Sequence, residues 1–337
     1  MRLRPPLGGL WLERGLIPKL AIGIDVGGTF IKAGLVNRRG EIVARGREMT
    51  QEPGRQNQVI SKIVATIRDL EKRMGPRGEI AGVGLGVAGL IHPEEGRILT
   101  SPNIPGWRDF PLLKYLRKEI RYPVFLENDA NAAALGEKWI GAARGIPTFC
   151  LLTLGTGVGG GLILEGKVWH GANGTAGEFG HMTIDPDGPW CSCGNRGCLE
   201  AYASVTALRR NIREAIASGR KTSLSMNGEN GPLNGEMIYR AAQKGDAVAR
   251  EEFERMGAAL GIGITNLIHL LSPQRVILGG GLSAAWKFFF PALRENVRQR
   301  AIPASARGVQ IIRASTGEDA GILGATYLVW RKLGLIP

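Results

Sequence analysis

Four side chains of the kind that bind zinc lie in the short stretch GHMTIDPDGPWCSCGNRGCLE, and they are His181, Cys191, Cys193 and Cys198. Gly194 and Gly197 lie between the last two cysteines and allow the tight turn that would bring three thiolates to one ion. Scattered core cysteines are the alternative, but three of the chain's four cysteines fall in this stretch. The pattern predicts a closed, structural zinc site of tetrahedral geometry.

Two carboxylates flank the same stretch. Glu178 precedes His181 by three residues, and Glu200 follows Cys198 by two. A metal ion in this loop would hold both carboxylates in place, so the loop would position functional groups as well as stabilise the local structure.

Three glycine-rich turns follow or join apolar segments, at residues 25–29, 155–161 and 279–281. Glycine lets backbone N–H groups approach phosphate oxygens closely. None of the turns has the sequence GxxxxGK[ST], and none is a GxGxxG that opens a helix after a strand. Any one of them alone would indicate a tight hairpin or close strand packing. Three together, the first carrying Asp25 and Thr29 with Lys32 nearby, predict an ATP site.

Asp129 lies in LENDANAAALGE, where an apolar strand runs into a helix. An Asp at that position is commonly a helix N-cap or a first-turn residue. The alternative follows from the strand end, which is where α/β sheets expose ligand-binding groups, and Asn128 stands beside it. A carboxylate there can accept a hydroxyl proton during attack on a phosphoryl group.

The elements that must position these residues alternate between strands and helices. Residues 20–49 predict three β segments, and strands are also expected at 81–91, 122–128, 148–174, 275–283 and 308–315. Helices are expected at 56–74, from 129, and at 205–218, 246–271 and 319–333. The pattern of the first half returns in the second, where the zinc segment interrupts it. Two related α/β domains would account for this order.

The other residues with reactive side chains have simpler interpretations. His92, His170 and His269 have no partner pattern and are expected at the surface or packed in the core. Cys150 falls inside an apolar strand and is expected to be a small core residue. Asp185 and Asp187 flank Pro186 and are expected to form a turn.

Composition excludes several classes of protein. The 337 residues suit two domains. No apolar run is long enough to span a membrane, and the first residues lack the features of a signal peptide, so a cytoplasmic protein is expected. The net charge of +13 is carried by dispersed residues without a basic run or an aromatic stripe. We therefore expect no nucleic-acid partner and a modest attraction for a polyanion such as a nucleotide.

From Leu20 on, the chain resembles the ROK family, a group of bacterial sugar kinases and related repressors within the actin and hexokinase superfamily. DVGGTFIKAGL resembles the first phosphate motif of that family, LGTGVGGG the second, and LGGGLS the adenosine-side motif. The zinc pattern HxxxxxxxxxCxCxxxxC, with a Glu two residues later, is matched at every position and is the most specific of these motifs.

The resemblance implies roles for individual residues. Asp129 would be the base that takes the proton from the sugar 6-hydroxyl, and His181 would bind zinc through one ring nitrogen and face the sugar with the other. The residues implied in sugar binding are Asn103, Asn128, Asp129, Glu178, His181 and Glu200. Those implied in binding ATP with Mg²⁺ are Asp25, Gly27, Gly28, Thr29, Lys32, Gly155, Thr156, Gly157, Gly159, Gly279, Gly280 and Gly281.

The family divides into kinases of several sugars and repressors that carry a winged helix-turn-helix domain before the first phosphate turn. Only 24 residues precede Asp25, and Pro5, Pro6, Gly8, Gly9 and Gly15 break them. We therefore expect a kinase that phosphorylates a hexose at the 6-hydroxyl, with glucose as the first choice. An N-acetylglucosamine or N-acetylmannosamine kinase, a non-enzymatic sugar-responsive regulator, and polyphosphate as the phosphate donor are the alternatives.

The expected fold is a two-domain actin/hexokinase-like (ribonuclease H-like) α/β fold with a duplicated βββαβαβα core and an interdomain cleft. The smaller domain would comprise residues 20–127 and 318–337. The larger would comprise residues 128–317, with the zinc insertion at 178–200. Residues 1–19 form a leader of no assigned role. The resemblance also implies a homodimer or a homotetramer.

Overall fold

The computed structural model describes residues 19–50, 56–75, 78–102, 104, 106–228 and 231–336. The leader expected at 1–19, apart from Lys19, and the sugar ligand expected at Asn103 lie outside these residues. The chain forms two compact units. The first unit comprises the chain up to Arg144, His170–Ala176 and Asp319 onward, and the second comprises Gly145–Trp169 and Gly177–Glu318.

The first unit is built on a five-stranded sheet of order β3-β2-β1-β4-β8. These strands are β1 (Lys19–Val26), β2 (Phe30–Val36), β3 (Ile42–Met49), β4 (Glu79–Val87) and β8 (Val124–Asn128). These include the three β segments predicted over residues 20–49, β1, β2 and β3, which pair as antiparallel neighbours. β4 and β8 continue the sheet in parallel with β1.

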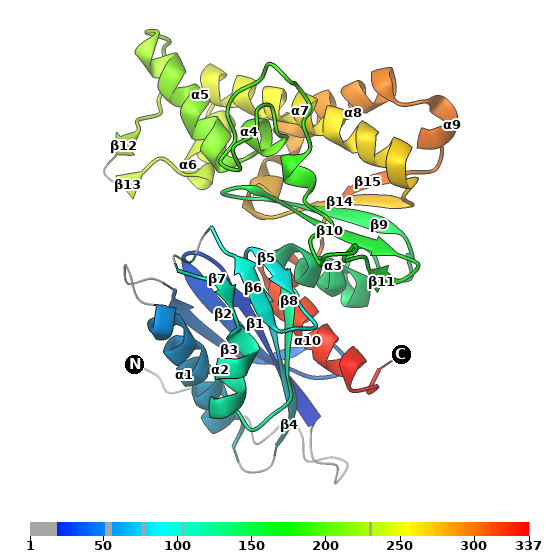
Figure 1. Cartoon of the computed structure of the whole chain (residues 1–337). Helices are drawn as coiled ribbons and strands as arrows, with labels where there is room; N and C mark the ends of the chain where they lie inside the picture. Colours follow the sequence, from blue (N-terminus) through cyan, green and yellow to red (C-terminus); the bar gives the residue numbers. More distant parts are fainter. Residues whose placement is uncertain are drawn as a thin grey trace. The chain divides into compact units, whose positions relative to one another are not determined.

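Helices cover both faces of this sheet (Figure 1). α1 (Gln56–Met74) and α2 (Leu112–Glu119) lie on one face, and α3 (Asp129–Ile140) and α10 (Ala320–Lys332) lie on the other. A separate three-stranded sheet of β5 (Leu90–His92), β6 (Arg97–Thr100) and β7 (Arg108–Phe110) follows β4. The largest core cluster of this unit joins the sheet to α1 and α2, and includes Ile22, Ile31, Ile63 and Leu116.

Glycines permit the close packing of α3 and α10. A Cβ atom added at Gly324 of α10 would lie 1.5 Å from the carbonyl oxygen of Ala132 in α3, so only glycine fits there. A Cβ added at Gly86 of β4 would lie 2.9 Å from Cβ of Ala132 and 3.6 Å from Cα of Asp129. The start of α3 can therefore lie directly against the sheet, and this places Asp129 there.

The second unit repeats the strand order of the first. Its sheet has the order β11-β10-β9-β14-β15, in which the first three strands are antiparallel and the last two run parallel to β9. The strands are β9 (Phe149–Leu154), β10 (Val158–Leu164), β11 (Lys167–Val168), β14 (Arg275–Gly279) and β15 (Gln310–Arg313). The duplication predicted from the sequence is confirmed at the level of topology.

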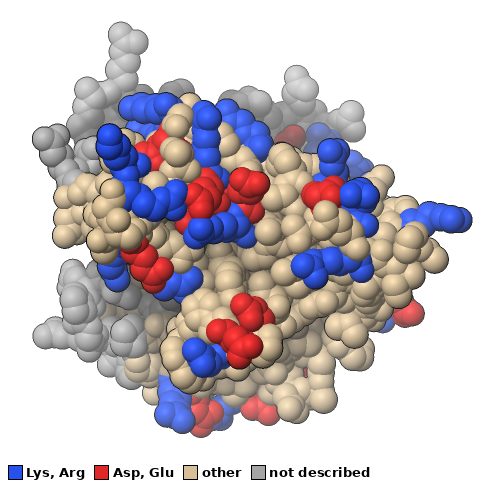
Figure 2. Space-filling model, turned by 90° about the horizontal axis from the view of Figure 1, so that it is seen from above, with Lys and Arg blue, Asp and Glu red and all other residues tan. Residues whose placement is uncertain are grey.

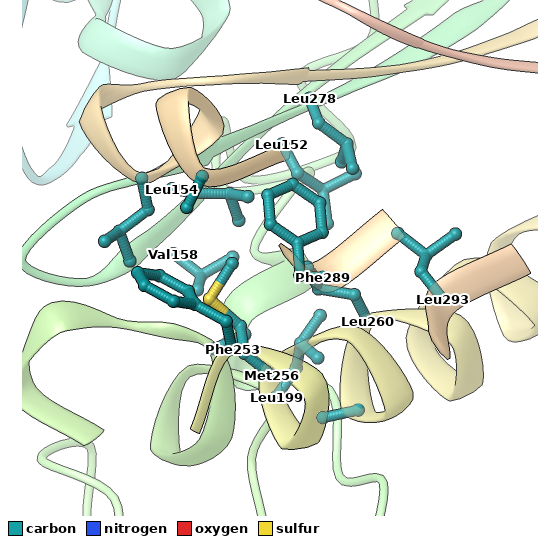
Figure 3. Close-up of a cluster of buried hydrophobic side chains, with 14 of the residues drawn as sticks. Leu152, Leu154, Val158, Leu199, Phe253, Met256, Leu260, Leu278, Phe289 and Leu293 are labelled. Atoms are coloured by element: carbon teal, nitrogen blue, oxygen red, sulfur yellow. The ribbon is translucent and has the colours of Figure 1, made fainter. Parts of the chain in front are cut away.

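Helices of the second unit pack over this sheet. They are α4 (Glu200–Ala203), α5 (Val205–Ala217), α6 (Gly235–Gln243), α7 (Ala247–Leu271), α8 (Trp286–Arg300) and α9 (Pro303–Ala306). A two-stranded ribbon, β12 (Asn227–Gly228) with β13 (Gly231–Pro232), precedes α6. Figure 3 shows part of the core, where Leu152 and Leu278 from the sheet lie near Phe289 of α8, and Val158 of β10 lies near Phe253 of α7.

The compact units divide the chain after Arg144 and not after residue 127. The reason is that α3 packs along α10 and against β4 and β8, which makes α3 part of the first unit. The segment His170–Ala176 also belongs to the first unit. The domain limits drawn from the sequence stay a prediction about independently folding parts.

Charged side chains of both signs are mixed on the face shown in Figure 2. Several charged side chains of the described residues form ion pairs, as Glu251 of α7 does with Arg255 of the same helix and with Arg220, which follows α5. In the part of the chain that the structure describes, no helix is long and apolar enough to cross a membrane.

Candidate active site and metal site

The first glycine turn is the hairpin between β1 and β2. Asp25 near the end of β1 stands directly opposite Lys32 of β2 in the antiparallel ladder. The hairpin is closed by the N–H of Gly27, which donates to the carbonyl of Phe30 at 3.0 Å. The hydroxyl of Thr50 donates to the carbonyl of Gly27 at 2.8 Å and holds the turn against the end of β3. The hairpin thus places one carboxylate and one ammonium group at its base.

Asp129 is the first residue of α3, directly after the carboxyl end of β8. The cap of this helix is Asn128, whose side-chain oxygen accepts the N–H groups of Ala130 at 2.9 Å and Asn131 at 3.0 Å. Asp129 Oδ1 also accepts the Ala130 N–H, at 2.9 Å. Because Asn128 already supplies the cap, capping alone does not account for an Asp at 129.

The pKa values of the two carboxyl groups are raised by a shared environment. Burial raises the pKa of Asp129 above its ordinary value, against hydrogen bonds from backbone N–H groups and Asn128. Burial also raises the pKa of Asp25 to about 7, with a further contribution from the charge of Asp129, while Lys32 lowers it. A pair of carboxyl groups held in this way can take up a proton near neutral pH. Such a pair is therefore suited to binding a cation or accepting a proton.

The second and third glycine turns meet in the second unit. Gly280 has φ +79° and a Cβ there would lie 2.4 Å from the carbonyl oxygen of Leu154, so glycine is required for this approach. Leu154 ends β9 and leads into the turn of Gly155, Thr156 and Gly157. Two backbone turns free of large side chains therefore lie next to each other.

The four predicted zinc ligands come together. One ligand atom from each of His181, Cys191, Cys193 and Cys198 lies within 4.8 Å of the other three. The Sγ atoms of Cys193 and Cys198 are 3.7 Å apart, and Cys191 Sγ is 3.6 Å from His181 Nδ1. A tetrahedral zinc with Zn–S bonds of about 2.3 Å needs sulfur atoms about 3.8 Å apart. The donor set and its spacing fit Zn²⁺.

The loop that carries these ligands has the turns expected from its glycines. Gly194 has φ +91° and Gly197 has φ +66°. Burial, followed by the neighbouring thiols of Cys193 and Cys191, raises the pKa of Cys198 to about 12. Three thiols this close cannot all ionise without a cation between them, which is the condition that a bound metal relieves.

Glu200 connects the metal loop to the second glycine turn. Its Oε2 accepts the N–H of Val158 at 2.9 Å, and its Oε1 accepts the hydroxyl of Ser192 at 3.3 Å. Val158 and Leu199, which precedes Glu200, both pack in the core of the second unit (Figure 3). The carboxylate is therefore held from both sides, and a change in the metal loop reaches the turn through it.

Glu178 precedes the metal loop and lies near the predicted ligand His181. Glu178 Oε2 is 3.8 Å from His181 Nε2, the ring nitrogen that faces away from Cys191. His181 thus presents Nδ1 to the thiols and Nε2 to a carboxylate, in the way a metal ligand commonly does. Both side chains are partly exposed, at 42% for Glu178 and 35% for His181.

Other sequence-based expectations are met in part. Cys150 is buried in β9, as expected, and Asp185 accepts the N–H of Asp187 at 3.1 Å in the expected turn. His170 differs from the expectation because its Nε2 lies 2.8 Å from Oε2 of buried Glu127. The two residues are far apart in the sequence, and no local pattern signals such a pair.

The two units define a class of protein. Each has three antiparallel strands followed by two parallel ones, with a glycine turn between its first two strands, which is the duplicated α/β arrangement of the actin/hexokinase-like fold. The chain belongs to the ROK family, whose model matches residues 21–332.

Individual relatives are similar over nearly the whole chain. A glucokinase of Thermotoga maritima is 40% identical, with 94% of this chain and 100% of the relative covered. A putative xylose repressor of Caldicellulosiruptor is 32% identical, with 94% of this chain and 80% of the relative covered. The crystal structure of a ROK family glucokinase from Streptomyces griseus with glucose and AMPPNP has a TM-score of 0.80 at 35% identity, covering 92% of this chain and 98% of that one.

Proposed function

We propose that this protein is an ATP-dependent sugar kinase that transfers the γ-phosphoryl group of ATP to the 6-hydroxyl of glucose. The observation that carries the proposal is the position and the buried environment of Asp129. It follows a strand end, it is not needed as a helix cap, and burial raises its pKa towards that of a useful base. The similarity to bacterial glucokinases over nearly the whole chain supports the same activity.

Asp129 accepts the proton of the sugar hydroxyl as its oxygen attacks the γ-phosphorus of ATP. The hydroxyl oxygen forms the new P–O bond, the bond to the β-phosphate oxygen breaks, and ADP leaves with the bonding electron pair. Oδ1 of Asp129 accepts the Ala130 N–H, which helps to fix the carboxylate, and Oδ2 is the atom proposed to take the proton. Asn128 and the backbone around it keep the carboxylate in place.

The glycine turns are the proposed phosphate-binding elements. Mg²⁺ would be held near Asp25, where it would neutralise phosphate charge. The proposed nucleotide-binding residues are those of the three turns predicted from the sequence, with Lys32 as the nearby cation. Burial raises the pKa of Asp25 to about 7, and a cation there would favour its ionised form.

Asn128, Asp129, Glu178, His181 and Glu200 are the proposed sugar-binding residues, and Asn103 is a further candidate outside the described part of the chain. Zn²⁺ held by His181 and the three cysteines would keep Glu178 and Glu200 in position. Cytoplasmic location and assembly as a homodimer or a homotetramer are part of the proposal, and light scattering of the purified protein tests the assembly.

The experiment that tests the activity is ADP release with ATP and Mg²⁺ over glucose, mannose, fructose, allose, N-acetylglucosamine and N-acetylmannosamine. Each sugar is run beside a sample without sugar, which measures ATP hydrolysis, and beside a sample with polyphosphate in place of ATP. We expect the highest kcat/KM with glucose.

Other results lead to different conclusions. Preference for an N-acetylated sugar would keep the mechanism and replace the substrate. No ADP release with any sugar, with glucose binding intact by calorimetry, would favour a sugar-responsive regulator. The similarity with a putative xylose repressor also points to that alternative. That outcome would refute the kinase proposal.

A further inference from the structure

His170 lies in a segment that the first unit receives from the second half of the chain. The segment His170–Ala176 is closed on itself by the N–H of Ala176, which donates to the carbonyl of His170 at 3.0 Å. Gly174 has φ +78°, and a Cβ there would lie 3.0 Å from the carbonyl oxygen of Ile91 in β5. The segment is thus fitted against the first unit at Gly174, while His170 points to β8.

His170 contacts a carboxylate that has almost no access to water. Its Nε2 is 2.8 Å from Glu127 Oε2, and the side chain of Glu127 is only 2% exposed. A buried carboxylate needs a charge partner and hydrogen bonds to remain ionised. Among the described residues, His170 supplies the ion pair of Glu127.

The other oxygen of Glu127 holds the residues on either side of Asp129. Glu127 Oε1 accepts the N–H of Asn128 at 2.9 Å and Nδ2 of Asn131 at 3.2 Å. Asn128 caps α3 and donates its own side-chain N–H to the carbonyl of Gly89 at 3.0 Å. Glu127 therefore braces the backbone at the start of the helix that begins with Asp129.

We propose that His170 is a positioning residue for phosphoryl transfer: as the cationic partner of Glu127, it keeps the brace around Asp129 formed. The proposal rests on the proposed function, in which Asp129 is the base. His170 itself does not touch a reacting atom. Its role passes through Glu127 to Asn128 and Asn131, which is a chain of contacts within the first unit.

The charges around His170 are consistent with a cation. The hydrogen bond with Glu127 raises the pKa of His170, burial and Lys332 at the end of α10 lower it, and Glu94 before β6 raises it. The imidazolium is therefore present at low pH and is lost as pH rises through the raised pKa of His170. A neutral imidazole stabilises the Glu127 carboxylate less than an imidazolium does, so the contribution of His170 to the brace is largest at low pH.

His170→Gln tests this because glutamine can donate a hydrogen bond but carries no charge. Relative to the wild type, we expect kcat with glucose to fall about tenfold at pH 6, where the wild-type imidazole is charged and glutamine is not. At pH 9 both side chains are neutral, so kcat should approach the wild-type value. His170→Lys keeps a cation and should recover most of the loss. Unchanged kcat at both pH values, or an equal loss at both as a purely structural role would give, overturns the proposal.

His92→Gln is the matched control. His92 is also a half-buried histidine of the first unit, 32% exposed against 34% for His170, but its nearest carboxylate, Glu95, is 58% exposed at 3.8 Å. The His92 variant should keep the wild-type pH profile. If His170→Gln fails to fold, Glu127→Gln replaces it, with a loss of kcat that is independent of pH expected and full activity as the refuting result.

A histidine NMR titration separates this proposal from the kinase proposal. His170 is assigned by the resonance that disappears in His170→Gln, and its pKa should lie above 6.5. A value at or below 6.5 refutes the ion pair even if the protein is an active kinase. A wild-type protein that phosphorylates no sugar refutes the function but leaves this titration readable.

Discussion

Replacing Asp129 by Asn separates the two roles that an Asp can have at the start of a helix. The variant keeps the size of the side chain and an oxygen that can accept the Ala130 N–H, which lies 2.9 Å from Asp129 Oδ1 in the wild type. It places an amide NH₂ where the hydroxyl proton must be accepted. Loss of a general base lowers the rate about 10²- to 10⁴-fold, which is about 2.7 to 5.5 kcal/mol in the activation free energy.

Stability should not follow activity in this variant. Asn128 continues to cap α3, and burial disfavours the charged form of Asp129, as its raised pKa indicates. The free energy of unfolding of Asp129→Asn at pH 8 should therefore equal or exceed that of the wild type. Sugar affinity, measured by calorimetry, should stay nearly unchanged because the amide still makes hydrogen bonds to hydroxyl groups.

The assay is ADP release at saturating ATP and glucose, beside thermal unfolding of the same preparations. Asp246→Ala is the matched control, because Asp246 does cap a helix, α7, and accepts the N–H of Ala249 at 3.0 Å. Asp246 Oδ2 also accepts hydrogen bonds from Thr222 and Ser223, so that variant should lose more stability than the about 1 kcal/mol of a helix cap and keep its kcat. If Asp129→Asn keeps more than a tenth of the wild-type kcat, Asp129 is not the base.

Three further predictions follow from the site. Cys193→Ser should lower zinc content, measured by mass spectrometry, and weaken glucose binding through Glu200; full affinity in zinc-free protein would contradict the coupling. Gly157→Ala places a Cβ 2.3 Å from Glu200 Oε2 and should reduce kcat/KM about tenfold or more, with a smaller loss for Gly155→Ala, where the space is open. Folded Asp25 holds its proton to about pH 7, so stability of the metal-free protein should fall as pH rises from about 4 to 7; denaturant titrations should show a weaker dependence in Asp25→Asn.

Much of the fold was predictable because its signals are local. The helix expected at 56–74 is α1. Those expected at 205–218, 246–271 and 319–333 correspond to α5, α7 and α10, with one or both ends shifted by a single residue. The helices α6 and α8 were not predicted from the sequence. α6 follows a polar, glycine-rich stretch, and α8 contains Pro291 within a run of aromatic residues that hides the helical period.

The site was predictable to the extent that its residues are close in the sequence. The four predicted zinc ligands lie in one short segment, and their spacing predicted that they come together, as they do. The roles of Asn128 and Asp129 stay predictions that rest on the resemblance. The bond from Val158 to Glu200 joins residues 42 apart, and the pair of His170 with Glu127 joins residues 43 apart. Such contacts depend on how strands and loops pack, and local sequence does not contain that information.

The interleaved path of the chain limits how genes of this family can recombine. Three segments of the first unit alternate with two of the second, so the fold has no single exchange point. A gene fragment for residues 145–318, taken from one relative and placed in another, would bring its own residue 170 but leave residue 127 to the host. Functional chimaeras must therefore inherit both members of this pair from compatible parents, and residues 127 and 170 should change together as relatives diverge.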